Sequence, residues 1–193
     1  MVASDNPRRR TGRTTREALL ASLGEVFESY GYDGATLSQL SAATGLGKAS
    51  LYHHFPGGKA EMAAALLRDR VANLERVAFA RLQGNLPPGE RLAAFIDGFR
   101  EYVQDGERAC LIQSFAQGSA AEQHGETIAR QYGDWRRRLA DVYAETGMKP
   151  KRADRAAAEL LSGLYGGLIT STISRDPDTF RRQAKRLKRG LPG

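Results

Sequence analysis

The chain has 193 residues, of which 41% are hydrophobic and 26% charged, and its formal net charge is +7. This composition is typical of a globular protein with one or two small domains, and it excludes collagen-like and disordered chains. The single cysteine, Cys110, excludes an intrachain disulfide and a cysteine-based zinc site. The longest uncharged stretch, residues 160–174, is shorter than the roughly 20 apolar residues that cross a bilayer. We therefore expect a cytoplasmic protein with no membrane partner.

The excess positive charge lies at the two ends of the chain. Residues 1–16 hold five arginines against Asp5, and residues 175–193 hold seven basic residues against two acids. Basic ends of this kind favour a polyanion, either a phosphate backbone or anionic lipid, although a merely solubilising role fits the C-terminal run equally well.

Apolar residues recur at steps of three and four throughout, which predicts an all-α fold. The prolines fall between the periodic segments or near the chain ends, where helices stop. The expected helices span residues 15–30, 37–44, 48–55, 59–83, 90–104, 109–117, 121–146, 153–174 and 179–189.

Capping signals mark several of these boundaries. Two pairs, Thr14 with Glu17 and Thr36 with Gln39, have the spacing of a capping box. Stop signals follow the first two helices at Gly31 and Gly45, and Asp176 before Pro177 predicts the start of the last helix.

The first three helices have the layout of a helix-turn-helix. An apolar set can lock the second and third helices at a steep angle: Leu37, Leu40, Leu46, Leu51 and Phe55. This packing leaves an outer face on the third helix that a DNA major groove could accept, formed by Lys48, Ala49, Ser50, Tyr52 and His53.

The chemistry of that face suits DNA. Lys48 at the helix start and the hydroxyls of Tyr52 and Thr36 are suited to phosphate contacts, which fix register. Base edges would be read by Lys48, Ser50, His53 and the small Ala49, which allows close approach to a thymine methyl. Because this base-reading set is small, we expect DNA shape to contribute much of the specificity.

Residues 15–70 resemble the TetR family of one-component transcriptional regulators. The resemblance rests on Phe-x-x-x-Gly-Tyr at 27–32, Gly-Ala-Thr at 34–36, Thr-Gly-Leu at 44–46 and Lys-Ala-Ser-Leu-Tyr-His-His-Phe-Pro-Gly-Gly-Lys at 48–59. The last motif looks most like the branch of drug-responsive repressors of the LmrA/YxaF type. This chain departs from the family pattern at two positions. It has Gly47 where the family often has a capping Ser or Thr, and Ala60 where an acid is common. The DNA contacts that the resemblance implies are Thr36, Lys48, Ser50, Tyr52, His53 and Lys59.

The resemblance also implies two domains, a helix-turn-helix domain over residues 13–73 and a helical ligand-binding and dimerisation domain over residues 74–193. The arginine cluster that includes Arg13 would then serve as an N-terminal arm on double-stranded operator DNA. The alternative is a frayed terminus with no role in binding.

Dimerisation is expected through the last two long helices. Apolar residues form a stripe there, and glycines would admit a neighbouring backbone despite costing about 1 kcal/mol each in helix propensity. The candidate interface residues are Leu160, Gly163, Leu164, Gly166, Gly167 and Leu168. Intrachain packing is the alternative, and a two-fold homodimer would bind a palindromic operator.

Aromatic and soft residues recur in the C-terminal half and could line a cavity for a flat, apolar small-molecule effector. The candidates are Phe95, Phe99, Tyr102, Cys110, Phe115, Trp135, Tyr143 and Tyr165. Residues of this kind at helical spacing are also typical of a plain core. Cys110 could sense oxidants or electrophiles, but a packed, inert thiol fits better because the chain has no resolving cysteine.

Other function classes find little support. No phosphate loop, nucleophile elbow or metalloprotease motif is present, so we expect no enzyme and no cofactor. The three histidines, His53, His54 and His124, are not spaced as a metal site. The competing hypothesis is a small helical module that binds anionic lipid or RNA through its basic ends, for which residues 179–189 would have to be a basic amphipathic helix.

Overall fold

The structure is a computed structural model that describes residues 15–192. The described chain contains helices and no strands, which confirms the all-α prediction. Its helices are α1 (Arg16–Gly34), α2 (Leu37–Thr44), α3 (Lys48–His54), α4 (Gly58–Val77), α5 (Pro88–Tyr102), α6 (Leu111–Phe115), α7 (Gly118–Glu145), α8 (Pro150–Ser174) and α9 (Pro177–Arg189), with short 3-10 helices η1 (Phe79–Leu82) and η2 (Gln104–Gly106). The predicted arm residue Arg13 lies outside the described residues, as does Thr14.

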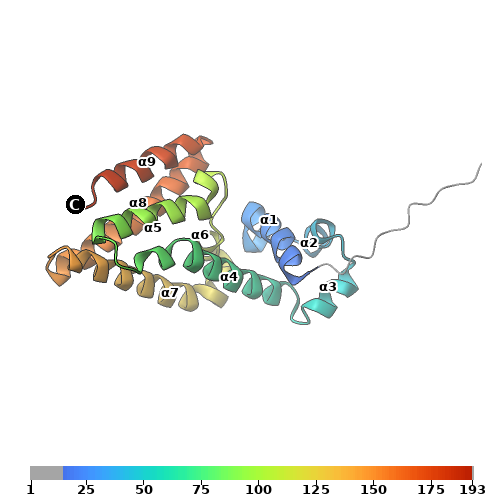
Figure 1. Cartoon of the computed structure of the whole chain (residues 1–193). Coiled ribbons are helices and arrows are strands. Elements are labelled where there is room, and N and C mark those ends of the chain that lie inside the picture. The colour runs from blue at the N-terminus through green and yellow to red at the C-terminus, as the bar shows by residue number, and fades with distance from the viewer. Residues whose placement is uncertain (1–14, 193) are drawn as a thin grey trace, which may run out of the picture.

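Figure 1 shows two lobes joined by α4. Helices α1–α3 form the smaller lobe, and α5–α9 form the larger helical bundle. The C-terminus lies at the end of the molecule opposite α3. The predicted domain boundary between residues 73 and 74 falls within α4, which packs against α1 on one side and against α5 and α6 on the other.

The small lobe is held by the apolar set that the sequence singled out. Leu40, Leu51 and Phe55 are fully buried, and Leu37 and Leu46 pack against them while partly exposed. Their burial fixes α3 against α2, so the opposite face of α3 must point outward.

The capping predictions for α2 and α9 are confirmed. Thr36 Oγ1 accepts a hydrogen bond from Gln39 N at 3.2 Å, and Gln39 Oε1 accepts one from Thr36 N at 2.8 Å. Gly45 ends α2 in the left-handed conformation, with φ 67°. At α9 the carboxylate of Asp176 accepts a hydrogen bond from Asp178 N at 3.0 Å.

The ends of α1 differ from the predictions. Thr15, not Thr14, caps its start, because Thr15 Oγ1 accepts a hydrogen bond from Ala18 N at 3.2 Å. Gly31 interrupts the helix as expected, with φ 66°, but one further turn follows as far as Gly34. Tyr30, directly before this interruption, is 58% exposed.

The helix predicted over residues 59–83 is two elements. Its regular part ends at Val77, and η1 follows with a tighter winding that buries Phe79 and Leu82. Helix α5 approaches the junction so closely that a Cβ on Gly98 would lie 2.1 Å from Val77 O. Phe79 then stacks on Trp135 with ring centroids 5.1 Å apart. The periodicity of residues 59–83 gives no sign that α5 packs against the end of α4, so the break at Val77 could not be predicted.

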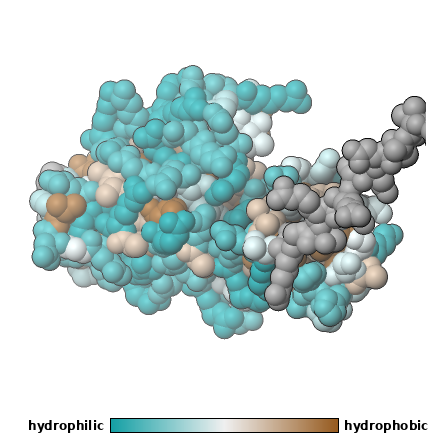
Figure 2. Space-filling model, turned by 45° about the vertical axis from the view of Figure 1, so that its right-hand side comes forward, coloured by the Kyte–Doolittle hydropathy of each residue, from teal (hydrophilic) through white to brown (hydrophobic). Residues whose placement is uncertain are grey.

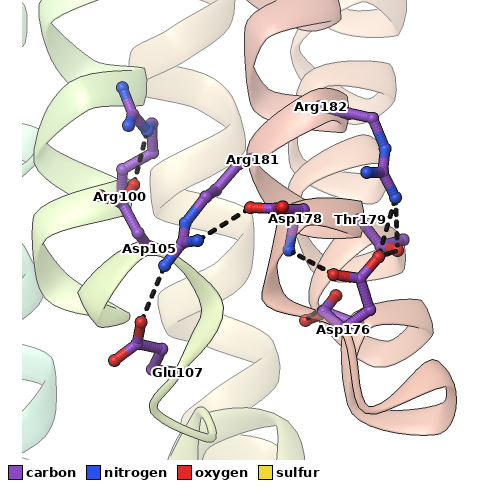
Figure 3. A network of polar contacts seen from close by, with 9 residues as sticks. Arg100, Asp105, Glu107, Asp176, Asp178, Thr179, Arg181 and Arg182 are labelled. Atoms are coloured by element: carbon purple, nitrogen blue, oxygen red, sulfur yellow. Dashed lines mark hydrogen bonds and ion pairs between the residues drawn. The ribbon is translucent and has the colours of Figure 1, made fainter.

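The C-terminal basic run is a helix docked on the bundle. Arg181 lies between Asp178 and Glu107 (Figure 3). Its Nη1 is 2.8 Å from Asp178 Oδ1, and its Nη2 is 2.7 Å from Glu107 Oε1. The apolar side of α9 is buried through Phe180 and Ala184. Because this side is covered within the chain, α9 has no free apolar face with which to enter a membrane, and the lipid-binding alternative loses its main support.

Across residues 15–192, the helices include none that combines the length and the apolar character of a membrane span. The same residues bring together no group of three or more His, Cys, Asp or Glu that could hold a metal ion. Figure 2 shows a mostly hydrophilic surface with small, separate apolar patches.

Candidate nucleic-acid interface

Helix α3 presents its outer face to solvent. Lys48, Ala49, Ser50, Tyr52 and His53 are all exposed, as are the flanking Gly47 and His54. The five predicted residues therefore share one accessible surface, here called the α3 outer face. It lies at the end of the small lobe, away from the C-terminal bundle (Figure 1).

Tyr52 is held in place but keeps its hydroxyl free. One edge of its ring lies over Gly58, where an added Cβ would come 3.2 Å from Tyr52 Cε1 and where φ is 64°. Tyr52 remains 45% exposed, and its hydroxyl forms no hydrogen bond within residues 15–192. A fixed ring with an open hydroxyl is suited to a positioned phosphate contact.

Arg16 adds positive charge beside α3. Its guanidinium carbon lies 5.5 Å from the centroid of the Phe55 ring, directly after the C-terminal end of α3. Cation–π contacts of this kind hold the charge near the ring without neutralising it. Arg16 therefore places a second cation near the C-terminal end of α3, in addition to Lys48 on the α3 outer face.

Two of the predicted DNA contacts are engaged within the protein. The hydroxyl of Thr36 donates to Gln39 Oε1 at 2.7 Å, in the capping box. The ammonium of Lys59 donates to Ala35 O at 2.9 Å and lies 4.6 Å from the centroid of the Tyr32 ring. Both residues therefore bind their own domain in this conformation, and the structure does not bring Lys59 to the α3 outer face.

A second candidate site is a partly open apolar cavity of about 470 Å³ in the bundle, between α6, α7 and α8. Its volume lies in the range typical of small-molecule sites, which is roughly 300–1,000 Å³. The lining residues are Ile112, Gln113, Ala116, Gly125, Ile128, Ala129, Tyr132, Trp135, Ser162 and Tyr165.

Only two of the eight predicted cavity residues, Trp135 and Tyr165, line it. The other six do not line this cavity. Five belong to the packed interior, namely Phe95, Phe99, Tyr102, Cys110 and Phe115, and Tyr143 lines a separate hollow at the far end of the bundle. The interior aromatic residues pack against one another, as when Phe99 meets Tyr165 edge-on at 5.4 Å.

Cys110 behaves as a packed residue. It is 2% exposed, and burial raises the pKa of its thiol. Since the thiolate is the reactive form, this environment disfavours a sensor role.

The cavity residues that the sequence analysis did not name include a recognisable set on α7. Ile128, Tyr132 and Trp135 are spaced by four and three residues, so they share one helix face. A polar cluster behind the cavity also went unpredicted. Glu75 of α4 accepts hydrogen bonds from Trp135 Nε1 at 2.6 Å and Arg138 Nη1 at 2.7 Å. Through Trp135, the cavity wall is therefore hydrogen-bonded directly to α4.

Most of the predicted dimer-interface residues pack within the chain. Leu160, Leu164 and Leu168 are buried within the chain. A Cβ on Gly163 would lie 2.9 Å from Leu187, and one on Gly167 would lie 3.0 Å from Gln183. These two glycines therefore make room for α9 of the same chain, and of the six candidates Gly166 alone is exposed.

Comparisons with known proteins agree with both halves of this arrangement. Residues 19–66 match the family "Bacterial regulatory proteins, tetR family", and residues 88–186 match "Transcriptional regulator LmrA/YxaF-like, C-terminal domain". The HTH-type transcriptional regulator LmrA of Bacillus subtilis is 25% identical over 84% of this chain and 88% of its own length.

Solved structures share the fold. A TetR transcriptional regulator from Legionella pneumophila superposes with a TM-score of 0.78 at 17% identity, over 94% of this chain and all of that chain. The TetR family regulator CifR, solved with a 26 bp double-strand operator DNA, superposes with a TM-score of 0.77 at 20% identity, over 95% of this chain and all of its own. With the exposed α3 face and the matches over both domains, the chain belongs to the TetR family and is a DNA-binding transcriptional regulator of its LmrA/YxaF-like branch.

Proposed function

We propose that this protein is a homodimeric repressor that leaves a palindromic operator when a small apolar or aromatic effector fills the cavity between α6, α7 and α8. The observation that carries the proposal is the α3 outer face, where the predicted DNA-contacting side chains of α3 are together and exposed. The activity is binding, with no catalytic step, and it takes place beside the chromosome in the cytoplasm.

In the proposed complex α3 lies in the major groove. Lys48 and Tyr52 bind phosphates and fix the register, while Ala49, Ser50 and His53 approach base edges. Thr36 and Lys59 contribute indirectly, since their side chains hold the start of α2 and the chain that precedes it.

We assign the dimer interface to the exposed side of α8, where α9 leaves the surface open. Ile169 is 39% exposed and Ile173 is 77% exposed, and both lie on the same side of the helix as Gly166 and Thr170. Exposed large aliphatic residues of this kind are typical of a surface that a partner covers. A two-fold axis there would place two α3 helices on successive half-sites.

The proposed signal runs from the cavity to α4. Trp135 forms part of the cavity wall, and its indole N–H is bonded to Glu75 on α4. Helix α4 begins only a few residues after α3, so a shift of α4 moves the recognition helix. The effector would stabilise a conformer whose α3 helices no longer match the two half-sites, and operator affinity would fall by its differential affinity for the two conformers.

The test is operator binding at several salt concentrations, by fluorescence anisotropy with a duplex from upstream of the coding gene. We expect Lys48→Ala to weaken binding roughly ten-fold. Its log–log salt slope should flatten by about 0.9 for each of the two Lys48 side chains in the dimer. Tyr52→Phe should weaken binding with little change of slope, because it removes a neutral contact.

The matched control is Lys151→Ala, which removes the same charge from an exposed position at the start of α8. It should retain the wild-type affinity and nearly the wild-type slope. Equal losses from Lys48→Ala and Lys151→Ala would show that net charge, and not α3, governs binding, and the proposed docking would be wrong.

A further inference from the structure

The last turn of α1 lies between the two lobes. Gly31 breaks the regular helix, with φ 66° and ψ 178°, and the following residues Tyr32 and Asp33 turn toward α6 and α7. The same turn leads through Ala35 directly into Thr36, the N-cap of α2. Any displacement of this turn is therefore passed to the helix-turn-helix over very few bonds.

Asp33 is bonded to the start of α7. Its carboxylate accepts a hydrogen bond from Ser119 N at 3.2 Å and another from the Ser119 hydroxyl. Gly118 fits the same spot, since φ is 61° and a Cβ there would lie 2.5 Å from Asp33 Oδ2. These hydrogen bonds lower the pKa of Asp33, so the acceptor is ionised at neutral pH.

Tyr32 meets the same two helices with its ring. It lies edge-on to Phe115 of α6 at 5.9 Å and edge-on to His124 of α7 at 6.5 Å. Its hydroxyl is hydrogen-bonded to Gln123, whose Nε2 lies 3.1 Å away. On the opposite side Lys59 holds the turn, through Ala35 O and the face of the Tyr32 ring.

These contacts share short chain segments with the cavity. Phe115 lies between the lining residues Gln113 and Ala116, and His124 precedes the lining residue Gly125. An occupant that changes the spacing of α6 and α7 must therefore also move the groups that hold Tyr32 and Asp33. This connection is separate from the one through Trp135 and Glu75, because it reaches α1 and α2 without passing along α4.

We propose that Tyr32 and Asp33 are positioning residues that couple the cavity to the DNA-binding lobe: the α1 clamp, formed by Tyr32, Asp33, Gln123 and Ser119, holds that lobe in its operator-binding orientation. The proposal rests on the proposed function of α3 and of the cavity. Breaking the clamp should weaken operator binding without a change in any DNA-contacting residue. It should also weaken the coupling between the cavity and the DNA.

The test uses the single tryptophan, Trp135, as a reporter in the cavity wall. Because coupling between two sites is reciprocal, operator binding must alter the cavity if the cavity controls operator binding. Operator duplex is titrated into the full-length dimer, and DNA anisotropy and Trp135 emission are recorded together. We expect wild type to show an emission change that saturates with the anisotropy.

Asp33→Ala should lose about five- to twenty-fold in operator affinity and part of the emission change, because the route through Trp135 and Glu75 to α4 is left intact. Asp33→Asn keeps an acceptor for Ser119 N and should restore much of both. Ser119→Ala should reproduce the loss, and it should add little to Asp33→Ala if the two residues act as a pair. The control is Asp141→Asn, which removes a carboxylate from an exposed position of α7 and should behave as wild type.

Thermal unfolding separates coupling from folding. If Asp33→Ala melts well below wild type, Ser119→Ala and Tyr32→Phe, which remove single hydrogen bonds, supply the answer. Variants that keep both the wild-type affinity and the wild-type emission change would overturn the clamp while leaving the α3 docking intact. A wild type that binds operator with no emission change would also overturn it, whereas a wild type that ignores the duplex would remove the proposed function itself.

Discussion

The two lobes differ in how their candidate functional residues relate to the buried core. In the small lobe a few buried residues such as Leu51 and Phe55 hold α3, and the proposed DNA-contacting side chains of α3 lie outside the core. In the bundle the wall of the proposed effector cavity shares residues with the core: Trp135 lines the cavity, stacks on Phe79 and donates a hydrogen bond to Glu75. A change at the outer surface can therefore alter binding alone, while a change in the bundle alters packing and regulation together.

The largest expected effect comes from Ile173, an apolar side chain on the outside of the bundle. Ile173→Lys should convert the dimer to a monomer, because a charge would be buried in the interface. Operator affinity should then fall roughly a hundred-fold, since two α3 helices no longer bind as a unit. Sedimentation velocity measures the first effect. Leu86→Lys, at an exposed leucine in the loop before α5, is the control. If Ile173→Lys remains dimeric, the interface lies elsewhere.

The two faces of α3 give the sharpest contrast between neighbouring residues. Leu51→Ala should destabilise the protein by about 2–5 kcal/mol, because Leu51 is fully buried. Ser50→Ala should change stability by less than about 0.5 kcal/mol and still weaken operator binding. Urea unfolding measures the change in stability, and fluorescence anisotropy with operator duplex measures the change in binding. If Ser50→Ala leaves affinity unchanged, Ser50 is not a base contact.

Two helical glycines of the bundle should respond in opposite directions. Gly98→Ala should cost about 1–3 kcal/mol, because its Cβ would collide with the backbone at Val77. Gly133→Ala should stabilise the protein by up to about 1 kcal/mol, because nothing lies within 4 Å of its Cβ position in α7. Thermal unfolding should show a lower Tm for Gly98→Ala and a higher Tm for Gly133→Ala. Equal effects would mean that α4 and α5 are farther apart than described.

The last expected effect is a pH dependence. Burial raises the pKa of Tyr143 from 10.0 to about 12, so the folded state keeps a proton that the unfolded chain releases. The stabilisation is complete below pH 10 and is lost as the pH rises toward 12. Tyr143→Phe should flatten this part of the stability curve, measured by urea unfolding. The buried Tyr102 and Tyr165 should retain part of the slope. An unchanged curve would show that Tyr143 ionises normally.

Much of the small lobe could be predicted because its signals are local. The Thr36 and Gln39 capping box, the left-handed Gly45 and the apolar spacing of α2 and α3 are each specified within a few residues. The outer face of α3 then follows from which side is buried. Lys59 shows the limit, since its partner Ala35 lies 24 positions earlier and no local pattern reports that bond.

The bundle could be predicted only as helices. An aromatic residue at helical spacing reads the same whether it packs against another ring, as Phe99 does, or borders empty space, as Tyr132 does. Gly163 and Gly167 correctly indicated that a helix approaches closely, but their sequence does not say whether that helix comes from the same chain. Here α9 takes the place expected for a partner.

Hydroxyl-radical footprinting of the upstream duplex tests the central claim most directly. Wild-type protein should protect two symmetric half-sites whose centres lie about 10 bp apart or a multiple of one helical turn, as expected when each subunit of a two-fold dimer places α3 in the major groove. Lys48→Ala should lose this protection at salt concentrations where Lys151→Ala retains it. Protection without symmetry, or a footprint that Lys48→Ala leaves unchanged, would contradict the account.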